Sequence, residues 1–387
     1  MSHAMLSPSS ADRWIHCPPS AKINAEAPRT DTIYTREGTL AHAVCELKAR
    51  KYFLTGIGPK KYKAAMDKFQ ADELWKPEMD GYTEEYLDAL KDIAAAFPEP
   101  PHVTLEQRVD FSEYVPEGFG TADCILISGE ILHVIDFKYG KGVPVSAKDN
   151  PQMKLYALGA LLDYMALYDI FTVRMTIVQP RIKHEPDTWE LPAKDLLCWA
   201  EEVVRPAAKL AAEGGGEFAE GEWCRWCAIR ATCRARAEVN TALEDFGFKK
   251  PPELSDAEVA QALTQGQRLK TWLSDLEEYA LAACLAGREL PGWKAVEGRS
   301  ERAWTDADAA FAAAKAAGVP EEMLYERKPV TLAGLEKIMG KKPFAAALKK
   351  FVVTPPGKPK LANADDTRPA ITNKPEPEDD FGEELPF

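Results

Sequence analysis

The fold is decided by residues 120–156, which read GTADCILISGEILHVIDFKYGKGVPVSAKDNPQMKLY. Two apolar runs, 121–127 and 131–138, flank the short link at 128–130, and this spacing predicts two antiparallel strands joined by a tight turn. Helical spacing of apolar residues then begins and continues over 150–166. A hairpin followed by a helix is typical of a mixed α/β unit.

The segments on either side extend this unit. Residues 103–109 alternate between apolar and polar side chains, and residues 171–178 form a further apolar run, so both are predicted strands. Helical spacing is found at 37–51, 83–97 and 192–213. The order helix, three strands, helix, strand predicts an α/β fold in which a mixed sheet is flanked by helices.

Polar residues interrupt the second strand of the hairpin at its end. Asp136 and Lys138 are two apart and leave the same face of an otherwise apolar strand, so they must be paired, solvated or bound to a ligand. Asp123 begins the neighbouring strand, close enough to share a cation with Asp136. Two carboxylates beside a lysine suit Mg²⁺ or Mn²⁺, which would neutralise charge on a phosphate. A surface salt bridge is the structural alternative.

Four more residues fall where they can join this group. His42 lies on the 37–51 helix, away from its apolar face, and Glu106 lies on the strand before Asp123. Gln152 and Tyr156 are four apart and share one face of the helix that follows. A helical histidine is also common as a purely structural residue.

The order of these residues resembles the PD-(D/E)XK nucleases and, more narrowly, their RecB-like branch. The resemblance implies a restriction-endonuclease-like core that hydrolyses DNA with Mg²⁺ or Mn²⁺. The implied roles are metal ligation by His42, Asp123 and Asp136, catalysis by Asp123, Asp136 and Lys138, catalytic support by Gln152 and Tyr156, and bracing of the site by Glu106.

Cysteines form a second group with ligand-like spacing. Cys224, Cys227 and Cys233 make an incomplete set of three, and Cys17, held between a helix end and two prolines, is the best candidate for a fourth ligand. An iron–sulfur cluster, a four-cysteine zinc site and free thiols all remain possible from the spacing. The other cysteines are predicted to be small buried residues, namely Cys45, Cys124, Cys198 and Cys284.

One N-terminal cysteine followed by a distant C-x2-C-x5-C resembles the iron–sulfur subgroup of RecB-like nucleases, which includes the AddB-type domain and CRISPR-associated RecB-like exonucleases. The resemblance implies a structural 4Fe–4S cluster that staples the two ends of the nuclease domain. The stretches 6–21, 289–304 and 355–366 also resemble a phage-encoded family of unknown function linked to this superfamily. That likeness implies a role in phage DNA recombination, replication or repair.

Charge limits how the chain could meet DNA. Its 387 residues carry 48 Lys and Arg against 61 Asp and Glu, a net charge of −13. This excludes a histone-like, purely electrostatic binder but not an enzyme with a local basic groove. Candidate phosphate contacts are Lys141, Lys148, Lys154 and Arg181, with ordinary solvated charge as the alternative. No helix-turn-helix or zinc-finger spacing is present, which predicts cleavage without sequence specificity.

Three parts are expected: a nuclease domain at 1–240, a mostly helical region at 241–354 and a disordered acidic tail at 355–387. The tail ends in PEPEDDFGEELPF, which resembles the acidic tip of bacterial single-stranded DNA-binding proteins and implies docking to a replication or recombination protein. A merely solubilising tail is the alternative. In the helical region, Trp293 and Trp304 either pack in a core or stack on single-stranded DNA.

Neither a membrane-spanning run nor a signal peptide is recognisable, so we expect a cytoplasmic protein, in the bacterial host if phage-encoded. The expected function is a metal-dependent DNA exonuclease without sequence specificity. A non-catalytic DNA-end-binding recombination scaffold that keeps the nuclease fold is the competing hypothesis, and a nuclease acting on RNA is also compatible.

Overall fold

The computed structural model describes residues 4–28, 32–54, 56–241, 255–296 and 307–316, together with a few single positions between 320 and 352. The chain divides into two compact units, Met1–Val296 and Glu297–Phe387. In the second unit the described helix is α11 (Ala307–Ala316). The acidic tail and Trp304 lie outside the described residues.

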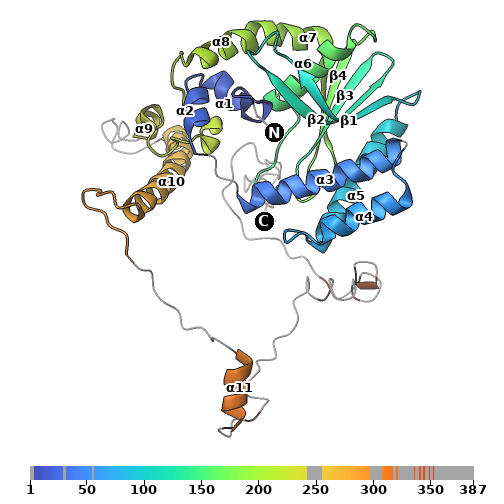
Figure 1. Cartoon of the computed structure of the whole chain (residues 1–387). Coiled ribbons are helices and arrows are strands. Elements are labelled where there is room, and N and C mark those ends of the chain that lie inside the picture. The colour runs from blue at the N-terminus through green and yellow to red at the C-terminus, as the bar shows by residue number, and fades with distance from the viewer. Residues whose placement is uncertain are drawn as a thin grey trace, which may run out of the picture. The chain divides into compact units, whose positions relative to one another are not determined.

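The centre of the first unit is a five-stranded mixed sheet (Figure 1). Its strands lie in the order β1 (His102–Asp110), β2 (Phe119–Ser128), β3 (Ile131–Phe137), β4 (Thr172–Val178) and β5 (Asp187–Pro192). The first three strands are antiparallel neighbours, β3 and β4 are parallel, and β5 is antiparallel to β4. The predicted hairpin is confirmed, and Gly129 in its turn has a φ of +56° that favours glycine.

The parallel pair is joined by helix α6 (Pro151–Tyr164), as parallel neighbours require a crossover connection. The side chain of Asn150 caps this helix by accepting hydrogen bonds from the backbone N–H groups of Gln152 and Met153. Beyond the end of β3, the backbone N–H of Lys138 donates to the carbonyl of Val178 at 2.9 Å. This bond extends the pairing by one residue and fixes the backbone of Lys138.

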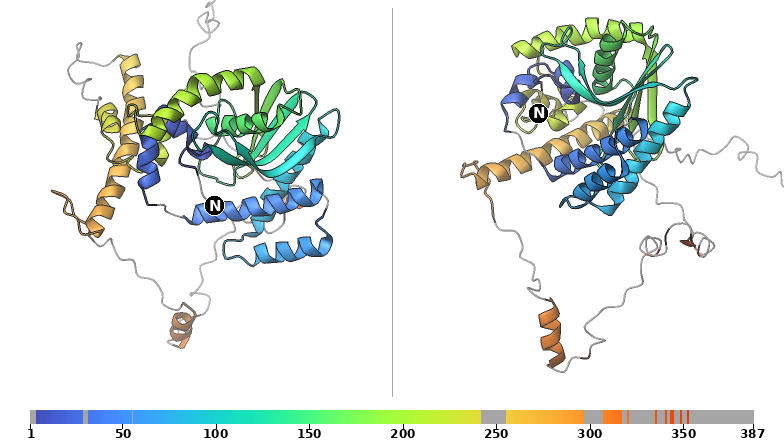
Figure 2. Two further views of the ribbon diagram at one scale, coloured as in Figure 1. Left: turned by 45° about the horizontal axis from the view of Figure 1, so that its top comes forward. Right: turned by 45° about the vertical axis from the view of Figure 1, so that its right-hand side comes forward.

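Helices cover both faces of the sheet (Figure 2). On one side lie α1 (Ala11–His16), α6, α7 (Ala193–Trp199) and α8 (Arg205–Glu213), and on the other lie α3 (Ile33–Phe53), α4 (Pro59–Gln70) and α5 (Pro77–Ala95). Side chains of β3 contribute to the hydrophobic cores on both faces of the sheet. Leu132 and Val134 pack with α6, whereas Ile135 and Phe137 pack with α3 and α5. Full burial of such a side chain stabilises the fold by roughly 1.5–3 kcal/mol.

A buried lysine side chain ties α3 to α5. The side chain of Lys48 is 3 % exposed, and its ammonium lies 2.9 Å from Asp80 and 3.0 Å from Glu84 at the surface. Burial opposes a charged lysine, but these two carboxylates raise its pKa above the ordinary value. Because α3 also carries His42, this pairing helps to set the position of that histidine relative to the sheet.

The first unit extends past the predicted boundary at residue 240. After α8 the chain forms the 3₁₀ turn η3 (Glu222–Trp226) and α9 (Arg234–Thr241), and the long helix α10 (Asp256–Leu285) packs on this segment. Asp275 of α10 pairs with Arg230 and Arg236, and the indole of Trp272 donates to the carbonyl of Ala231 at 2.8 Å. Helix α10 therefore belongs with the cysteine segment. No helix among the described residues is long and apolar enough to cross a bilayer.

Candidate active site

The sheet opens where the acidic residues of its first three strands meet. Pairing between β1 and β2 is interrupted at Glu106 and Asp123, and pairing between β2 and β3 ends one position before Asp123 and Asp136 would face each other. The Asp123 carboxylate instead accepts a hydrogen bond from the backbone N–H of Phe137 at 2.7 Å. Glu106 has a φ of +49°, an unusual value for a residue other than glycine. Such strain costs about 1–3 kcal/mol and clusters at functional sites.

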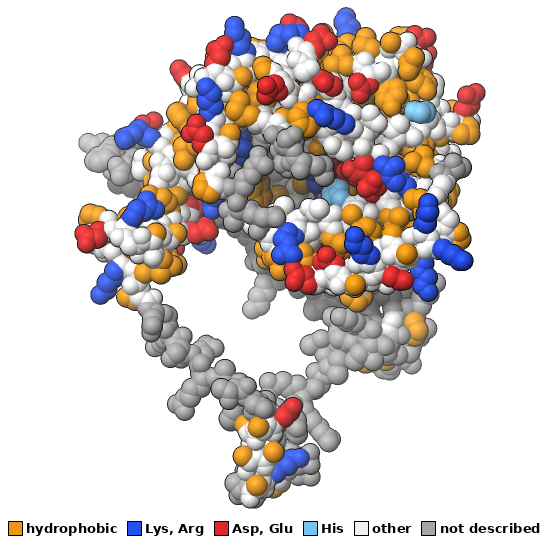
Figure 3. Space-filling view, in the orientation of Figure 1, with side chains coloured by type: hydrophobic (Ala, Val, Ile, Leu, Met, Phe, Trp, Pro, Cys, Tyr) orange, Lys and Arg blue, Asp and Glu red, His pale blue; other side chains and the backbone are white. Residues whose placement is uncertain are grey.

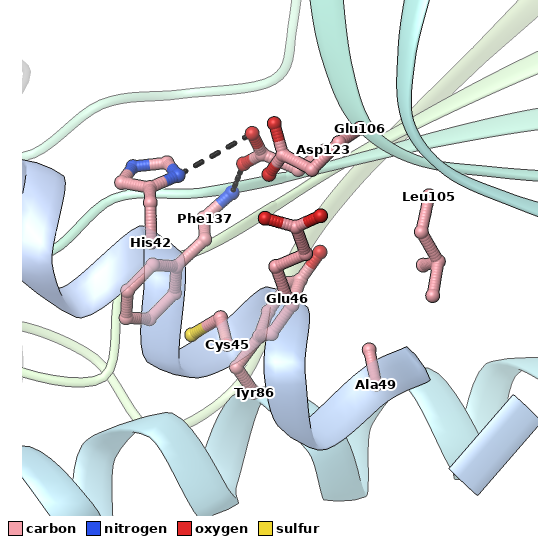
Figure 4. Close-up of a pocket in the computed structure, with 9 residues that line it drawn as sticks. All are labelled: His42, Cys45, Glu46, Ala49, Tyr86, Leu105, Glu106, Asp123 and Phe137. Carbon is pink, nitrogen blue, oxygen red and sulfur yellow. Dashed lines mark hydrogen bonds and ion pairs between the residues drawn. The ribbon is translucent and has the colours of Figure 1, made fainter. Parts of the chain in front are cut away.

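Helix α3 brings a histidine to this opening (Figure 4). The Nδ1 atom of His42 lies 3.3 Å from Asp123 Oδ1. The imidazole and the Phe137 ring pack edge to face, with their centroids 5.4 Å apart. His42, Glu106 and Asp123 each offer one ligand atom, and these three atoms lie within 4.8 Å of one another. One imidazole and two carboxylates therefore form a set that fits a divalent cation.

The compact group shares His42 and Asp123 with the ligand set predicted from the sequence. That prediction has Asp136 as the third ligand and Glu106 as a brace. In the structure Glu106 lies within the compact group, whereas Asp136 is buried next to it and pairs with the ammonium of Lys138 at 3.0 Å. Both carboxylates thus border the same opening, from different strands.

The charged groups at the opening strongly shift one another's pKa values. Burial disfavours the charged imidazole, but the Asp123 carboxylate, with a smaller contribution from Asp136, outweighs it and raises the pKa of His42 to about 9. Burial alone would raise the pKa of Asp123, but His42 and the N–H of Phe137 hold it below its usual range. Burial, with the nearby Asp123 and Glu46 carboxylates, raises the pKa of Glu106 to about 7. Without a cation, the site therefore holds protons at neutral pH.

We expect cation binding to release those protons, because a ligating imidazole is neutral and a ligating carboxylate is ionised. Affinity for Mn²⁺ should rise with pH until the pH passes about 9, the pKa of His42. Without the cation, the raised pKa means that the His42–Asp123 pair stabilises the fold fully below a pH of about 6.5, as long as Asp123 is ionised. This stabilisation is lost as the pH rises from there through about 9. Calorimetry in two buffers of different ionisation enthalpy gives the proton count.

A His42→Gln variant should release about one proton fewer at pH 7. As a matched control, His184→Gln should behave like the wild type, because His184 is exposed and pairs with Glu85 at 2.7 Å, away from the opening. An affinity that does not change with pH would contradict the prediction.

Lys138 is held in a chain of polar contacts that leads to α6. Its ammonium donates to Gln152 Oε1 at 3.2 Å, and Gln152 Nε2 donates to the Tyr156 hydroxyl oxygen at 3.1 Å. Burial, with a smaller contribution from Asp136, raises the pKa of Tyr156 well above its usual range, so the hydroxyl keeps its proton. The structure thus brings Asp136, Lys138, Gln152 and Tyr156 together in one chain of contacts.

Gly120 makes room for that tyrosine. A Cβ at this position would lie 2.7 Å from Cε1 of Tyr156 and 2.8 Å from Cγ of Pro8. Neither neighbour is the end of a flexible chain, so a larger residue would displace the ring. The spacing Gly120-x-x-Asp123 therefore combines a packing requirement with a site residue.

One acidic residue of the opening, Glu46, was not predicted from the sequence. Glu46 lies one helical turn after His42 on α3, lines the same pocket and pairs with Arg50 at 2.6 Å. Its signal was the spacing of four from His42, which places both side chains on one helix face. Acidic side chains also gather beside a histidine on the face shown in Figure 3.

The four predicted phosphate contacts divide into two kinds. Lys141 and Lys148 are exposed. Lys154 is buried, pairs with Asp149 at 2.8 Å and lies 4.8 Å from the ring centroid of Trp199. The side chain of Arg181 is 7 % exposed and is surrounded by Glu37, Glu78, Tyr82 and Tyr139. Lys154 and Arg181 are thus paired with acidic residues inside the fold, whereas Lys141 and Lys148 are open to solvent.

The predicted cysteine ligands come together at a second place. Cys17, Cys224, Cys227 and Cys233 line one cavity, and only Cys233 is more than slightly exposed. Arg13 lines the same cavity, and its buried Nε has no hydrogen-bond partner among the residues described. Four thiols beside a guanidinium N–H that has no hydrogen-bond partner fit an anionic group ligated by thiolates. The remaining cysteines are mixed, because Cys45 and Cys124 are buried as predicted but Cys198 is exposed.

A family model described as "Protein of unknown function (DUF2800)" matches residues 3–369. The chain belongs to the DUF2800 family. The match spans most of both units, in agreement with the sequence-based resemblance to a family of unknown function.

Two solved structures are similar to this DUF2800 chain. "Crystal Structure of LHK-Exo in complex with dAMP" is 14 % identical, with a TM-score of 0.24, and the match covers 46 % of this chain and 93 % of that one. "Crystal structure of SSO0001" is 15 % identical, with a TM-score of 0.22 and coverage of 58 % and 96 %.

Proposed function

We propose that this chain is a divalent-cation-dependent DNA nuclease. The observation that carries the proposal is the convergence of His42, Glu106 and Asp123 within 4.8 Å, beside the Asp136–Lys138 pair, at a point where the sheet opens. A structural salt bridge would need only two of these residues. The clustering of half-buried and buried carboxylates, an imidazole and an ammonium is typical of a site that handles phosphate with a cation.

His42, Glu106 and Asp123 would hold Mg²⁺ or Mn²⁺, with Asp136 adjacent to them. When bound, such a cation acts as a Lewis acid and neutralises charge that develops on the phosphate. Lys138, fixed by Asp136 and Gln152, holds the scissile phosphate or the attacking water through its ammonium. Tyr156 accepts from Gln152, so its own O–H is free to donate to the substrate.

The proposed mode is exonucleolytic, on the resemblance to RecB-like exonucleases. It is independent of sequence, because the chain carries no motif for reading base edges. We place the activity in phage DNA recombination, replication or repair, on the resemblance stated for stretches 6–21, 289–304 and 355–366. The competing scaffold hypothesis requires DNA binding without chemistry. The complete set of charged residues at the opening favours the nuclease.

We further propose that the cysteine cavity holds a 4Fe–4S cluster. Its four cysteines are the ligands, and Arg13 supplies the spare donor. The burial of Cys17, Cys224 and Cys227 in one cavity beside Arg13 supports an anionic thiolate-ligated group. A four-cysteine zinc site is the competing occupant. Stoichiometric zinc in anaerobically purified protein would contradict the proposal.

The test is a cleavage assay on end-labelled linear and circular DNA, single- and double-stranded, with Mg²⁺, Mn²⁺ or EDTA. We expect cation-dependent degradation of linear DNA that Lys138→Met reduces by about 10²-fold or more. Lys209→Met is the matched control, because Lys209 is exposed on α8. A folded wild type that binds DNA but never cuts it would favour the scaffold.

A further inference from the structure

The turn between two of the cavity cysteines presents an aromatic side chain to solvent. Trp226 is 71 % exposed, although Cys224 and Cys227 on either side of it are buried. The nearby Trp223 behaves differently, because it stacks on His16 with ring centroids 4.3 Å apart and donates its indole N–H to the carbonyl of Ala219 at 2.9 Å. Trp223 therefore serves packing, whereas packing does not explain the position of Trp226.

Three hydrogen bonds fix the backbone around Trp226. Arg13 of α1 donates to the Trp226 carbonyl at 2.9 Å, and the N–H of Cys227 donates to the carbonyl of Cys224 at 3.0 Å. Asn24, on helix α2 (Ser20–Glu26), accepts from the N–H of Ala228 at 2.9 Å. Helices α1 and α2 lie beside this segment in Figure 1. A ring on a fixed backbone loses little conformational entropy when a planar ligand stacks on it.

A positively charged side chain lies beside the Trp226 ring. The Arg225 guanidinium lies 5.5 Å from the centroid of the Trp226 ring. Of the other arginines in the segment, Arg230 and Arg236 pair with Asp275. In the part of the chain that the structure describes, Arg225 and Arg234 have no acidic partner and both are exposed. A protein of net charge −13 thus keeps one arginine without an acidic partner, Arg225, beside an exposed indole.

We propose that Trp226 and Arg225 form a stacking platform for single-stranded DNA, with a base on the indole and a phosphate on the guanidinium. This deepens the proposed nuclease function and rests on it for the identity of the ligand. Only unpaired strands offer free base faces, and every base has one, so the platform binds without reading sequence. The platform would guide a strand by contacts outside the cation site.

Binding is measured by fluorescence anisotropy with a labelled oligothymidylate, using anaerobically purified full-length protein in EDTA so that no cleavage occurs. Trp226→Ala removes one stacked base, worth about 1–3 kcal/mol, and should bind about 5- to 150-fold more weakly than the wild type. Trp226→Phe should restore most of the affinity. Arg225→Ala should lower the salt dependence of binding by about one phosphate contact. Phe171→Ala is the matched control, because Phe171 is also an exposed aromatic residue, at 61 %, and lies directly before β4.

Unchanged affinity of Trp226→Ala, or an equal loss for Phe171→Ala, would overturn the platform. Duplex DNA bound more tightly than the single strand would also overturn it, and an equally bound RNA oligonucleotide would widen the ligand to single-stranded nucleic acid, keeping the stacking contact. The two proposals fail separately. A protein that binds through Trp226 but never cuts retains the platform and loses the nuclease, and a nuclease that ignores Trp226 does the reverse.

Discussion

Replacement of Asp123 by asparagine should reduce DNA cleavage by about 10³-fold or more, equivalent to about 4 kcal/mol of transition-state stabilisation. The substitution removes a charge from the compact group with His42 and Glu106. It keeps an oxygen that can accept from the N–H of Phe137, a bond of 2.7 Å in the wild type, so the strands should still pair. Cation binding is thus lost while the fold is retained.

The pKa of His42 provides an independent readout of the same change. In the wild type the Asp123 carboxylate outweighs burial and raises that pKa to about 9. Without the carboxylate charge, burial should prevail and the pKa should fall. An NMR titration of the imidazole therefore shows whether asparagine has removed the coupling, whether or not any activity is detected.

The matched control for this experiment is Asp187→Asn. Asp187 also accepts from a backbone N–H, that of Ala147 at 2.7 Å, but it lies on β5 away from the opening. Asp187→Asn should keep cleavage within a few-fold of the wild type. Equal losses in both variants would indicate a structural effect, and an active Asp123→Asn would contradict the assigned cation site.

The central hairpin was predictable because its residues are apolar, alternate regularly and are separated by a short turn. The register follows from the turn, so the proximity of Asp123 and Asp136 could be anticipated. The elements that were missed have weaker patterns. Strand β5 is an edge strand whose residues alternate between exposed and half-buried, and helix α4 buries only Met66.

The finer arrangement of the site depends on partners distant in sequence. Membership of Glu106 in the compact group follows from its left-handed backbone, which side-chain pattern does not encode. The burial of Lys154 and Arg181 likewise follows from aromatic and acidic residues on other elements. Residue type predicted the chemistry of these positions, but tertiary packing decided which charges stay available to a ligand.

Replacement of Cys17 by serine should remove the cysteine-ligated group and destabilise the protein. Cys17 caps α1, whereas the other three cysteines follow α8, so a shared group closes a loop of about two hundred residues. In the chain-entropy model, such a closure contributes about 5 kcal/mol, comparable with the whole stability of many domains. The melting temperature should fall by about 10 °C or more.

Cys198→Ser makes the same chemical change at an exposed cysteine and is the matched control for Cys17→Ser. It should retain the iron content, visible absorbance and melting temperature of the anaerobically purified wild type, whereas Cys17→Ser should lose all three. Hydrogen exchange should show the loss of protection in α1, η3 and their neighbours. These segments are joined by the hydrogen bonds from Arg13 to the Trp226 carbonyl and from the Ala228 N–H to Asn24. A Cys17→Ser protein with full iron content and unchanged melting would show that Cys17 is not a ligand, since serine cannot supply the thiolate that a 4Fe–4S cluster requires.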